Sequence, residues 1–364
     1  MKKSMYPNLN INLRYLRENV EYYVDKCHAI GVDIAGVIKG THGIVQCTEQ
    51  FAKGGASQIA SSRLEQLQDA KDYGIELPMM LIRVPMLSEV HDVVEICDIS
   101  LNSDEQVLDA LNKAAAAAGK VHQVILMADL GDLREGFWDK EDMIRVAERV
   151  ESEMDNLELL GVGTNLGCYG SIMPTADKLD QLVELAEKVE SRIGRTLRYI
   201  SGGATSSLMR VIDGDLPKRI NHLRVGEAIL LSYDLNVLYG YDVSKLHRDI
   251  YTVRAEVIEV KDKPTHPIGT IGFDAFGRQP EYVDRGIRKR ALLAIGKVDI
   301  GDCAEIFPRD EGVELLGGSS DHTIADIEDA KRDIKVGDIM EFDIDYAALV
   351  SLTSSRNVKI TFEE

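Results

Sequence analysis

The sequence predicts an N-terminal (β/α)8 TIM barrel followed by a C-terminal all-β domain, on three observations. The chain has 364 residues, which is long enough for two domains. Up to about residue 235, short runs rich in β-branched residues alternate with longer amphipathic runs, as in repeated strand–helix units. Beyond that point the sequence reads as strands separated by turns, without helical periodicity.

Eight apolar runs are interpreted as the barrel strands. They lie at Asp33–Lys39, Ser57–Ser61, Met79–Val84, Asp98–Asn102, Gln123–Asp129, Leu157–Asn165, Leu197–Gly202 and Asn221–Val225. The segments between them have helical spacing, as in Thr175–Ile193 and in Ser103–Ala118, where Ser103 is the expected N-cap. Eight such units form a (β/α)8 barrel, and a doubly wound open sheet is the alternative architecture.

The C-terminal part is predicted to contain strands alone. They are expected at Tyr251–Val260, Arg290–Ile295, Val313–Leu316, Ile339–Ile344 and Val358–Phe362, with turns at Pro264, Pro267, Gly317–Gly318 and Gly337–Asp338. We expect residues 14–235 to form the barrel and residues 236–364 to form the β-domain. The opening strand within residues 1–13 is expected to pack with the β-domain.

Composition narrows the partners and the compartment. The net charge of −19 disfavours nucleic acid and anionic membranes as partners; it either serves solubility or attracts a cationic substrate. The cysteines are scattered, odd in number and without CxxC spacing, which argues against disulfides or a zinc site and favours a reducing cytoplasm. We see neither a signal peptide nor an apolar stretch of membrane-spanning length.

Active sites of barrels lie at the C-terminal ends of the strands, and the first strand is predicted to end on Lys39. A lysine there points into the barrel mouth, where desolvation and neighbouring cations lower its pKa and favour Schiff-base formation. The alternative is a lysine that extends to solvent or pairs with a carboxylate.

The segments after strands six to eight suit a phosphate-bearing ligand. Strand seven runs into a glycine, serine and threonine cluster that contains Thr205 and Ser206, and Gly226 follows strand eight. Glycines allow close approach of backbone N–H groups, and hydroxyls donate further bonds. Barrels often bind phosphate after strands seven and eight, and Asn165 at the end of strand six is expected to face the same ligand.

Several phrases in order along the chain carry a family resemblance. They are GVIKGTHG around Lys39, LGDLREG around Arg134, GTNLGCYG, YISGGATSS, LRVGEAILL around Arg224, PIGTIGFDAFG, GIRKRALLAIG and LGGSSDHTIAD. The set resembles the fold-type III pyridoxal-phosphate enzymes of the alanine racemase superfamily, and within it the ornithine racemase-like branch. The resemblance spans essentially the whole chain.

The resemblance implies roles for individual residues toward pyridoxal 5'-phosphate. Lys39 is expected to hold the cofactor as a Schiff base and to act as a base on one face of the substrate α-carbon. Arg224 matches the arginine that faces the pyridine nitrogen, and Arg134 matches one near the cofactor and the substrate carboxylate; a salt bridge with Asp132 or Glu135 is the alternative for Arg134. Ser206 and Gly226, with Thr205 nearby, match phosphate ligands, and Tyr346 matches a tyrosine that lines the site from the C-terminal domain.

Two departures from alanine racemases concern tyrosines. Gly43 stands where a phosphate-contacting tyrosine is expected, and Phe273 stands where the partner subunit's catalytic tyrosine is expected. Racemisation needs proton transfer on both faces of the α-carbon, so another residue is required. Asp274 and His322 are the first candidates for this catalytic role, and Cys168 and Tyr169 are further ones.

The resemblance also implies an amino-acid racemase that works as a head-to-tail homodimer, with the partner's β-domain completing the site. The substrate is expected to be basic, such as ornithine, with Asp274, Asp321 or Asp132 as a possible carboxylate for its ammonium group. The rivals are a fold-type III decarboxylase and a non-catalytic pyridoxal-phosphate homeostasis protein. No metal is expected. His322 is followed by Thr323 and Ile324, so it does not begin the His-x-Cys or His-x-Asp pair that metal-dependent relatives carry.

Overall fold

The computed structural model describes residues 5–279 and 281–364 and divides the chain into two compact units. One unit comprises residues 14–247, and the other joins residues 1–13 to residues 248–364. The boundary lies at His247, twelve residues beyond the position 235 expected from the sequence (247 − 235 = 12). The reason is that Asn19 holds His247 through both backbone groups, since its Oδ1 accepts from the His247 N–H at 2.9 Å and its Nδ2 donates to the carbonyl at 2.8 Å.

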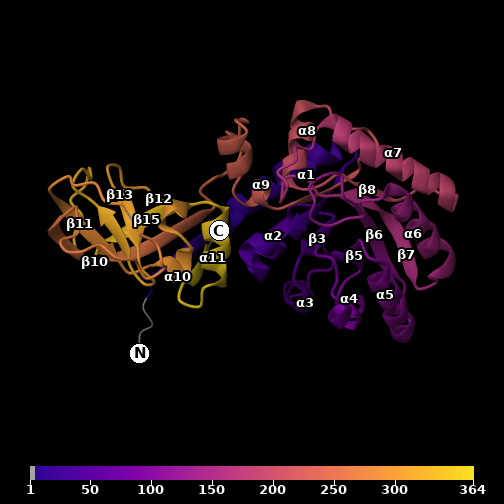
Figure 1. Ribbon diagram of the computed structural model, residues 1–364, viewed down its shortest axis with the longest axis horizontal. Coiled ribbons are helices and arrows are strands. Elements are labelled where there is room, and N and C mark those ends of the chain that lie inside the picture. Colours follow the sequence, from indigo (N-terminus) through magenta and orange to yellow (C-terminus); the bar gives the residue numbers. More distant parts are fainter. Residues whose placement is uncertain (1–4, 280) are drawn as a thin grey trace. The chain divides into compact units, whose positions relative to one another are not determined.

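The first unit is a closed parallel barrel, as predicted (Figure 1). Its strands are β2 (Asp33–Val37), β3 (Gln58–Ser61), β4 (Met79–Leu81), β5 (Ile99–Asn102), β6 (His122–Ala128), β7 (Leu157–Thr164), β8 (Tyr199–Ser201) and β9 (His222–Val225). Pairing of Asp33 with His222 and of Ala35 with Arg224 joins β2 to β9 and closes the barrel, which excludes the open-sheet alternative.

Helices lie on the outside of the barrel, and all but the first and the last of them connect its strands (Figure 1). They are α1 (Leu13–His28), α2 (Val45–Lys53), α3 (Leu64–Asp72), α4 (Val90–Ile96), α5 (Glu105–Ala118), α6 (Lys140–Glu153), α7 (Ala176–Ile193), α8 (Leu208–Asp213) and α9 (Glu227–Leu230). The prediction of Ser103 as the cap of α5 is wrong. Asp104 caps this helix, because its carboxylate accepts from the N–H groups of Gln106 and Val107.

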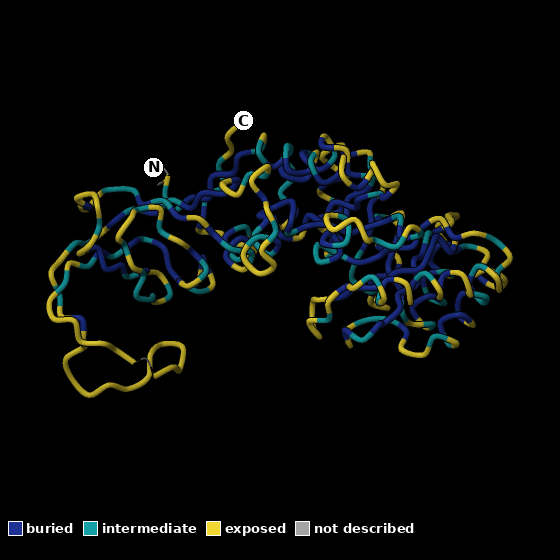
Figure 2. The backbone as a smooth tube through the Cα atoms, turned by 90° about the horizontal axis from the view of Figure 1, so that it is seen from above, coloured by how far each residue is buried: buried dark blue, intermediate teal, exposed yellow. Residues whose placement is uncertain are grey.

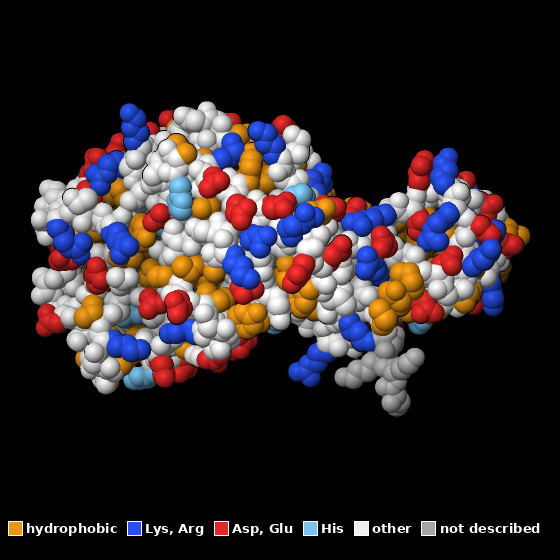
Figure 3. All heavy atoms as spheres, turned by 180° about the vertical axis from the view of Figure 1, so that it is seen from behind, with side chains coloured by type: hydrophobic (Ala, Val, Ile, Leu, Met, Phe, Trp, Pro, Cys, Tyr) orange, Lys and Arg blue, Asp and Glu red, His pale blue; other side chains and the backbone are white. Residues whose placement is uncertain are grey.

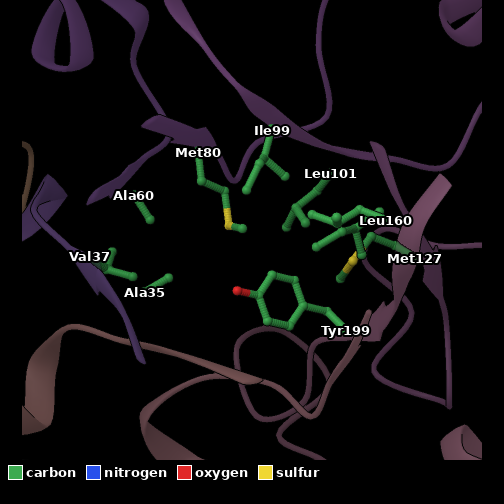
Figure 4. Close-up of a cluster of buried hydrophobic side chains, with 10 residues drawn as sticks. Ala35, Val37, Ala60, Met80, Ile99, Leu101, Met127, Leu160 and Tyr199 are labelled. Atoms are coloured by element: carbon green, nitrogen blue, oxygen red, sulfur yellow. The ribbon is translucent and has the colours of Figure 1, made fainter. Parts of the chain in front are cut away.

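The barrel interior is largely apolar. Its main cluster of buried side chains consists of Ala35, Val37, Ala60, Met80, Ile99, Leu101, Ile125, Met127, Leu160 and Tyr199 (Figure 4). These residues come from strands on several sides of the barrel and fill it, so that the barrel is a packed core and not a channel. The polar end of Tyr199 is the exception within this cluster.

The second unit is built on an antiparallel sheet. It comprises β1 (Asn8–Asn12), β10 (Tyr251–Pro264), β11 (Ile287–Leu293), β12 (Ile306–Pro308), β13 (Glu314–Gly318), β14 (Thr323–Asp326), β15 (Ile339–Ile344) and β16 (Lys359–Glu363). The strand order is β12-β15-β10-β11-β14-β13, and β1 pairs antiparallel with β10 and parallel with β16. Figure 2 shows a long loop between β10 and β11, in which residues 266–279 and 281–286 are exposed.

This unit departs from the all-β expectation in two places. Helix α11 (Tyr346–Ser354) and the short α10 (Lys297–Ile300) interrupt the strands. Gly317 and Gly318 do not form a turn but end β13, next to a register shift between Leu315 and Gly317. A bulge accommodates glycine within a strand, which explains why a glycine pair was misread as a turn.

The surface carries its charge in mixed form. On the face drawn in Figure 3, acidic and basic side chains are interspersed and not separated into single-sign areas. The net charge of −19 therefore does not form one acidic patch on that face. Among the described residues, none of the helices combines the length and apolar character needed to cross a bilayer.

Candidate active site

The C-terminal ends of the barrel strands bring together most of the predicted site residues. Lys39 follows β2, Arg134 lies in the loop after β6, and Asn165 follows β7. Thr205 and Ser206 follow β8, whereas Arg224 and Gly226 lie at the end of β9. Because all these strands are parallel, their carboxyl ends meet at one mouth, as is typical of barrel enzymes.

Lys39 opens a short helical turn, Lys39–Thr41, two residues beyond the end of β2 at Val37. The Thr41 hydroxyl fixes this turn by donating to the Ile38 carbonyl at 3.0 Å. The Lys39 side chain is accessible to solvent, yet desolvation by the surrounding protein lowers its pKa, and Arg134 and Arg224 add to this effect against the opposing influence of Cys168. An accessible lysine that is more easily deprotonated suits covalent chemistry at a carbonyl.

Arg134 forms a two-point ion pair with its neighbour Glu135. Its Nη2 donates to Oε1 at 2.6 Å, and its Nε donates to Oε2. The hydrogen bonding of Arg134 to the Glu135 carboxylate is the main reason that the pKa of Arg134 is raised. The pairing expected as an alternative is therefore present, with Glu135 and not with Asp132, and it holds one edge of the guanidinium.

Asp132 instead organises the loop after β7. Its buried carboxylate accepts from the backbone N–H groups of Gly167 at 2.9 Å and Tyr169 at 3.1 Å, on either side of Cys168. These bonds use the carboxylate, so Asp132 is a poor choice for binding a substrate ammonium group. Cys168 itself raises the pKa of both Lys39 and Arg134.

The segment after β8 has the features of a phosphate cradle. Gly203 has a φ of +119°, and a Cβ on it would lie 2.6 Å from the Ser207 hydroxyl. Thr205 begins a helical turn, whose first N–H groups have no partner within the turn, and its hydroxyl accepts from the Ala228 N–H at 3.2 Å. Ser206 donates to the Leu166 carbonyl at 3.0 Å and thereby joins this segment to the loop after β7.

Gly226 completes the cradle from β9. A Cβ at this position would lie 3.1 Å from the Val37 Cβ and 3.2 Å from the Val37 carbonyl oxygen. A larger residue would therefore push into β2, immediately before Lys39. Glycine here leaves the backbone open to a ligand, as a phosphate site requires.

Asn165 carries a polar group that lacks a partner. Its side chain is buried, and its Nδ2 is among the buried atoms of the described residues without a hydrogen-bond acceptor. A buried amide N–H without an acceptor is costly, and a bound ligand can supply one. This orphaned donor at the barrel mouth fits a cofactor with polar ring substituents.

Arg224 is almost completely buried. Its Nη1 donates to the Ser201 hydroxyl at 2.5 Å, and its Nη2 donates to the Thr164 carbonyl at 2.9 Å. Burial lowers its pKa to about 10, which still leaves a cation at neutral pH. Since a guanidinium has more N–H donors than these two bonds use, it can also face a ligand in the barrel mouth.

Gly43 shows why a tyrosine is absent from the turn after Lys39. The backbone there is left-handed, with a φ of +72°, and a Cβ would lie 2.7 Å from the Gln66 Cβ. The helix that carries Gln66 therefore occupies the space that a larger residue at position 43 would need. Any phosphate contact from this side must come from another residue.

The remaining predicted residues lie in the second unit. The Asp274 carboxylate accepts from the backbone N–H groups of Phe276 at 2.9 Å and Arg278 at 2.8 Å, and the latter bond is the main cause of its lowered pKa. His322 is exposed, just before β14, and Tyr346 is the first residue of α11. Phe273 is 77% exposed in the loop between β10 and β11. The two backbone N–H groups that Asp274 accepts from hold its side chain as a carboxylate.

Sequence reasoning missed the polar side chains beneath the mouth. Gln58, Ser201 and His222 are buried in the barrel and connected to Arg224 by hydrogen bonds. A signal was present, since each is a polar residue at an inward position of an otherwise apolar strand. The described residues contain no group of three or more His, Cys, Asp or Glu side chains arranged to hold a metal ion.

Comparison with known proteins places this geometry among amino-acid racemases. The sequence profile of the family "Alanine racemase, N-terminal domain" matches residues 11–234. An ornithine racemase of Acetoanaerobium sticklandii is 40% identical over 98% of this chain and 99% of its own length. A lysine racemase of Thermotoga maritima is 38% identical over 99% of both.

Solved structures share the fold at lower identity. An alanine racemase from Streptomyces lavendulae has a TM-score of 0.77 at 17% identity and covers 100% of this chain and 98% of that one. A D-threonine aldolase from Filomicrobium marinum has a TM-score of 0.69 at 15% identity and covers 96% and 88%, respectively. At these identities the likeness concerns the arrangement of barrel and sheet.

Proposed function

The chain belongs to the alanine racemase family, and we propose that it racemises ornithine with pyridoxal 5'-phosphate bound covalently to Lys39. Members of this family depend on that cofactor, and both full-length relatives named above are racemases of basic amino acids. The chain is accordingly a pyridoxal-phosphate-dependent racemase of a basic amino acid. Ornithine is preferred over lysine because the ornithine racemase is the more similar of the two.

The observation that carries the role of Lys39 is its position at the barrel mouth. It lies near Arg134 and Arg224, both of which lower its pKa, and the glycine cradle of Gly203 and Gly226 lies at the same mouth. The cofactor, when bound, supplies an electron sink for the bonds of the substrate α-carbon. Lys39 would hold the cofactor through Nζ and would move the proton on one face of the substrate α-carbon.

The other predicted residues then act as holders. Ser206, Thr205 and Gly226 would bind the phosphate, Asn165 would donate its free N–H to the ring, and Arg224 would face the ring nitrogen. Because Arg224 is a cation that does not readily release a proton, that nitrogen would stay unprotonated. Arg134, braced by Glu135, would bind the substrate carboxylate.

We further propose a head-to-tail homodimer in the cytoplasm. In this arrangement the second unit of one copy completes the barrel mouth of the other and excludes water. Tyr346 would line the site from the C-terminal domain. His322 of the partner subunit would move the proton on the second face, since an imidazole ring has one nitrogen that can accept a proton and one that can donate it. Asp274 of the partner subunit, held as a carboxylate, would bind the side-chain ammonium of the substrate or take the proton itself. All five cysteines are free, which suits a reducing compartment.

The experiment that tests this function incubates the purified protein with a panel of L-amino acids in heavy water and follows them by NMR. We expect ornithine, and more slowly lysine, to exchange the α-proton for deuterium while optical rotation falls to zero. Loss of the carboxyl carbon as gas would instead identify a decarboxylase. Retention of the α-proton in every amino acid would support the homeostasis protein.

A further inference from the structure

A continuous chain of hydrogen bonds runs through the barrel interior and ends on Arg224. Arg224 Nη1 contacts Ser201 Oγ at 2.5 Å, and Ser201 Oγ contacts His222 Nδ1 at 2.8 Å. On the other side of the ring, His222 Nε2 contacts Gln58 Oε1 at 2.9 Å. Gln58 Nε2 then contacts Tyr199 Oη at 3.0 Å, and Tyr199 Oη contacts Asp33 Oδ2 at 3.1 Å. Of these side chains, only that of Asp33 has substantial contact with solvent.

This chain of hydrogen bonds connects the two ends of the barrel. Arg224 lies toward the C-terminal end of β9, at the mouth, whereas Asp33 is the first residue of β2, at the opposite end. Alternate residues of a strand point to the same side, so His222 and Arg224 both face inward. Figure 4 shows the Tyr199 ring lying across the interior with its hydroxyl oxygen directed toward the side of Ala35, which belongs to β2.

The Arg224 end of these bonds allows either tautomer of His222. A guanidinium can only donate, so Ser201 accepts from Arg224, and it still has both a proton and a second lone pair with which to meet Nδ1 of His222. The direction of the bonds is therefore decided at the other end.

At that end a carboxylate can only accept, so Tyr199 donates to Asp33 and its oxygen accepts from the amide nitrogen of Gln58. This turns the Gln58 oxygen toward His222, which requires the proton of the neutral ring on Nε2 and leaves Nδ1 to accept from Ser201. The Asp33 end thus defines the tautomer, and every dipole along these bonds points the same way.

We propose that these hydrogen-bonded side chains orient Arg224, with Ser201, His222, Gln58 and Tyr199 as positioning residues for it. The consequence for catalysis rests on the proposed function, in which Arg224 faces the cofactor ring. The guanidinium is buried, and neither of its two bonds goes to a carboxylate, although Glu135 acts on it electrostatically from the mouth. Aligned dipoles that end on Asp33 compensate this buried charge, as a buried ion requires.

A structural role alone would be the usual interpretation of polar residues at the N-terminal end of a barrel. It predicts lost stability on substitution but no particular tautomer of His222. The proposal predicts one tautomer of His222 and predicts that it depends on the distant Tyr199 hydroxyl. An experiment can therefore distinguish the structural role from the positioning role.

The test uses cofactor-free protein labelled with nitrogen-15 at histidine, so it does not depend on racemase activity. We expect the His222 ring nitrogens to show a neutral ring protonated on Nε2. Tyr199→Phe removes only the hydroxyl that joins Gln58 to Asp33, and it should convert this signal into a mixture of tautomers. Tyr23→Phe, which removes a buried hydroxyl outside the chain, should leave the signal unchanged.

The loaded enzyme gives the second measurement. Tyr199→Phe should lower kcat about tenfold, the effect of one lost hydrogen bond in a coupled network, with an unchanged KM because Arg224 does not touch the substrate. A wild-type His222 protonated on Nδ1, or a Tyr199→Phe spectrum identical to that of Tyr23→Phe, would overturn the proposal. An inactive wild type with the expected tautomer would instead count against the proposed function alone.

Discussion

The Glu135 carboxylate holds the guanidinium of Arg134 at two points, through Nη2 at 2.6 Å and through Nε. Such side-on pairing fixes the plane of the guanidinium as well as its position. One edge of Arg134 is thereby committed to the protein. The arrangement suits an arginine that must present its remaining N–H groups to a substrate carboxylate in one orientation.

We expect Glu135→Gln to raise the KM for ornithine about tenfold while kcat falls less than threefold, because a charge-assisted bond is replaced by a weaker neutral one. Steady-state kinetics on the variant measure both constants. Glu141→Gln, at an exposed position of α6, is the matched control and should leave both unchanged. An unchanged KM in Glu135→Gln would contradict the role of the pair in carboxylate binding.

Position 43 is expected to require glycine for two reasons, its left-handed backbone and the closeness of a neighbouring residue. Gly43 and Gly31 have similar φ values, +72° and +76°, but only a Cβ at Gly43 would meet another residue, Gln66, at 2.7 Å. Gly31→Ala should therefore cost about 1 kcal/mol of stability from backbone strain alone. Gly43→Ala should cost about 2 kcal/mol more, because of overpacking.

Thermal or urea unfolding of the two variants gives this difference directly. Equal losses in both would mean that the helix carrying Gln66 moves away easily. In that case the close approach would not explain why a tyrosine is absent after Lys39.

Glu227 is expected to make stability depend on pH. Its Oε1 accepts from the N–H groups of Tyr233 and Asp234, whereas its Oε2 is buried without a partner among the described residues, and burial raises its pKa to about 7. The pKa of Glu227 in the folded protein lies above its unfolded value of 4.5. The stability that Glu227 contributes is therefore fully present below pH 4.5 and is lost as the pH rises through about 7.

Glu227→Gln removes this loss and keeps one acceptor oxygen. We expect the free energy of unfolding of the variant, relative to wild type, to increase by on the order of 2 kcal/mol between about pH 5 and pH 8. Urea unfolding at several pH values measures it, with the exposed Glu184→Gln on α7 as control. A constant difference across this range would show that Glu227 is already ionised at low pH.

The shared-site dimer predicts recovery of activity from two inactive variants. Lys39→Ala lacks the base of the barrel, and His322→Ala lacks the proposed group of the second unit. After subunit exchange, random pairing leaves one intact site in half of the dimers, so about a quarter of wild-type activity should return. Mixtures that stay inactive, although sedimentation shows dimers, would exclude a site shared in this way.

The sequence predicted the barrel well because its signal is local and repeated. Each observed barrel strand begins within two residues of its predicted start, and the ends of β2 and β4 are the least accurate. Helix α11 was missed because its segment, YAALVSLTS, lacks a clear polar face, so it has no helical period to detect. The cap of α5 was misplaced by one residue because Ser103 and Asp104 are both good capping residues.

Contacts between distant strands could not be predicted in the same way. Gln58, Tyr199 and His222 are separated by long stretches of sequence, and only the closure of β2 on β9 brings their side chains together. Lys39 was singled out by its position at the end of a predicted strand, and the family resemblance assigned roles to it and to Arg224. The choice between Asp132 and Glu135 as the partner of Arg134, and the support that Ser201 gives to Arg224, emerge only from the contacts.

The attachment of the cofactor to Lys39 is the central claim, and chemical reduction tests it most directly. Borohydride treatment of the enzyme saturated with pyridoxal 5'-phosphate fixes the cofactor to the lysine that holds it, and peptide mass spectrometry locates the modified residue. We predict the pyridoxyl group on the peptide that contains Lys39, and its absence from Lys39→Ala but not from Lys53→Ala. A pyridoxyl group on any other lysine of the wild-type enzyme, or none at all, would contradict the assignment.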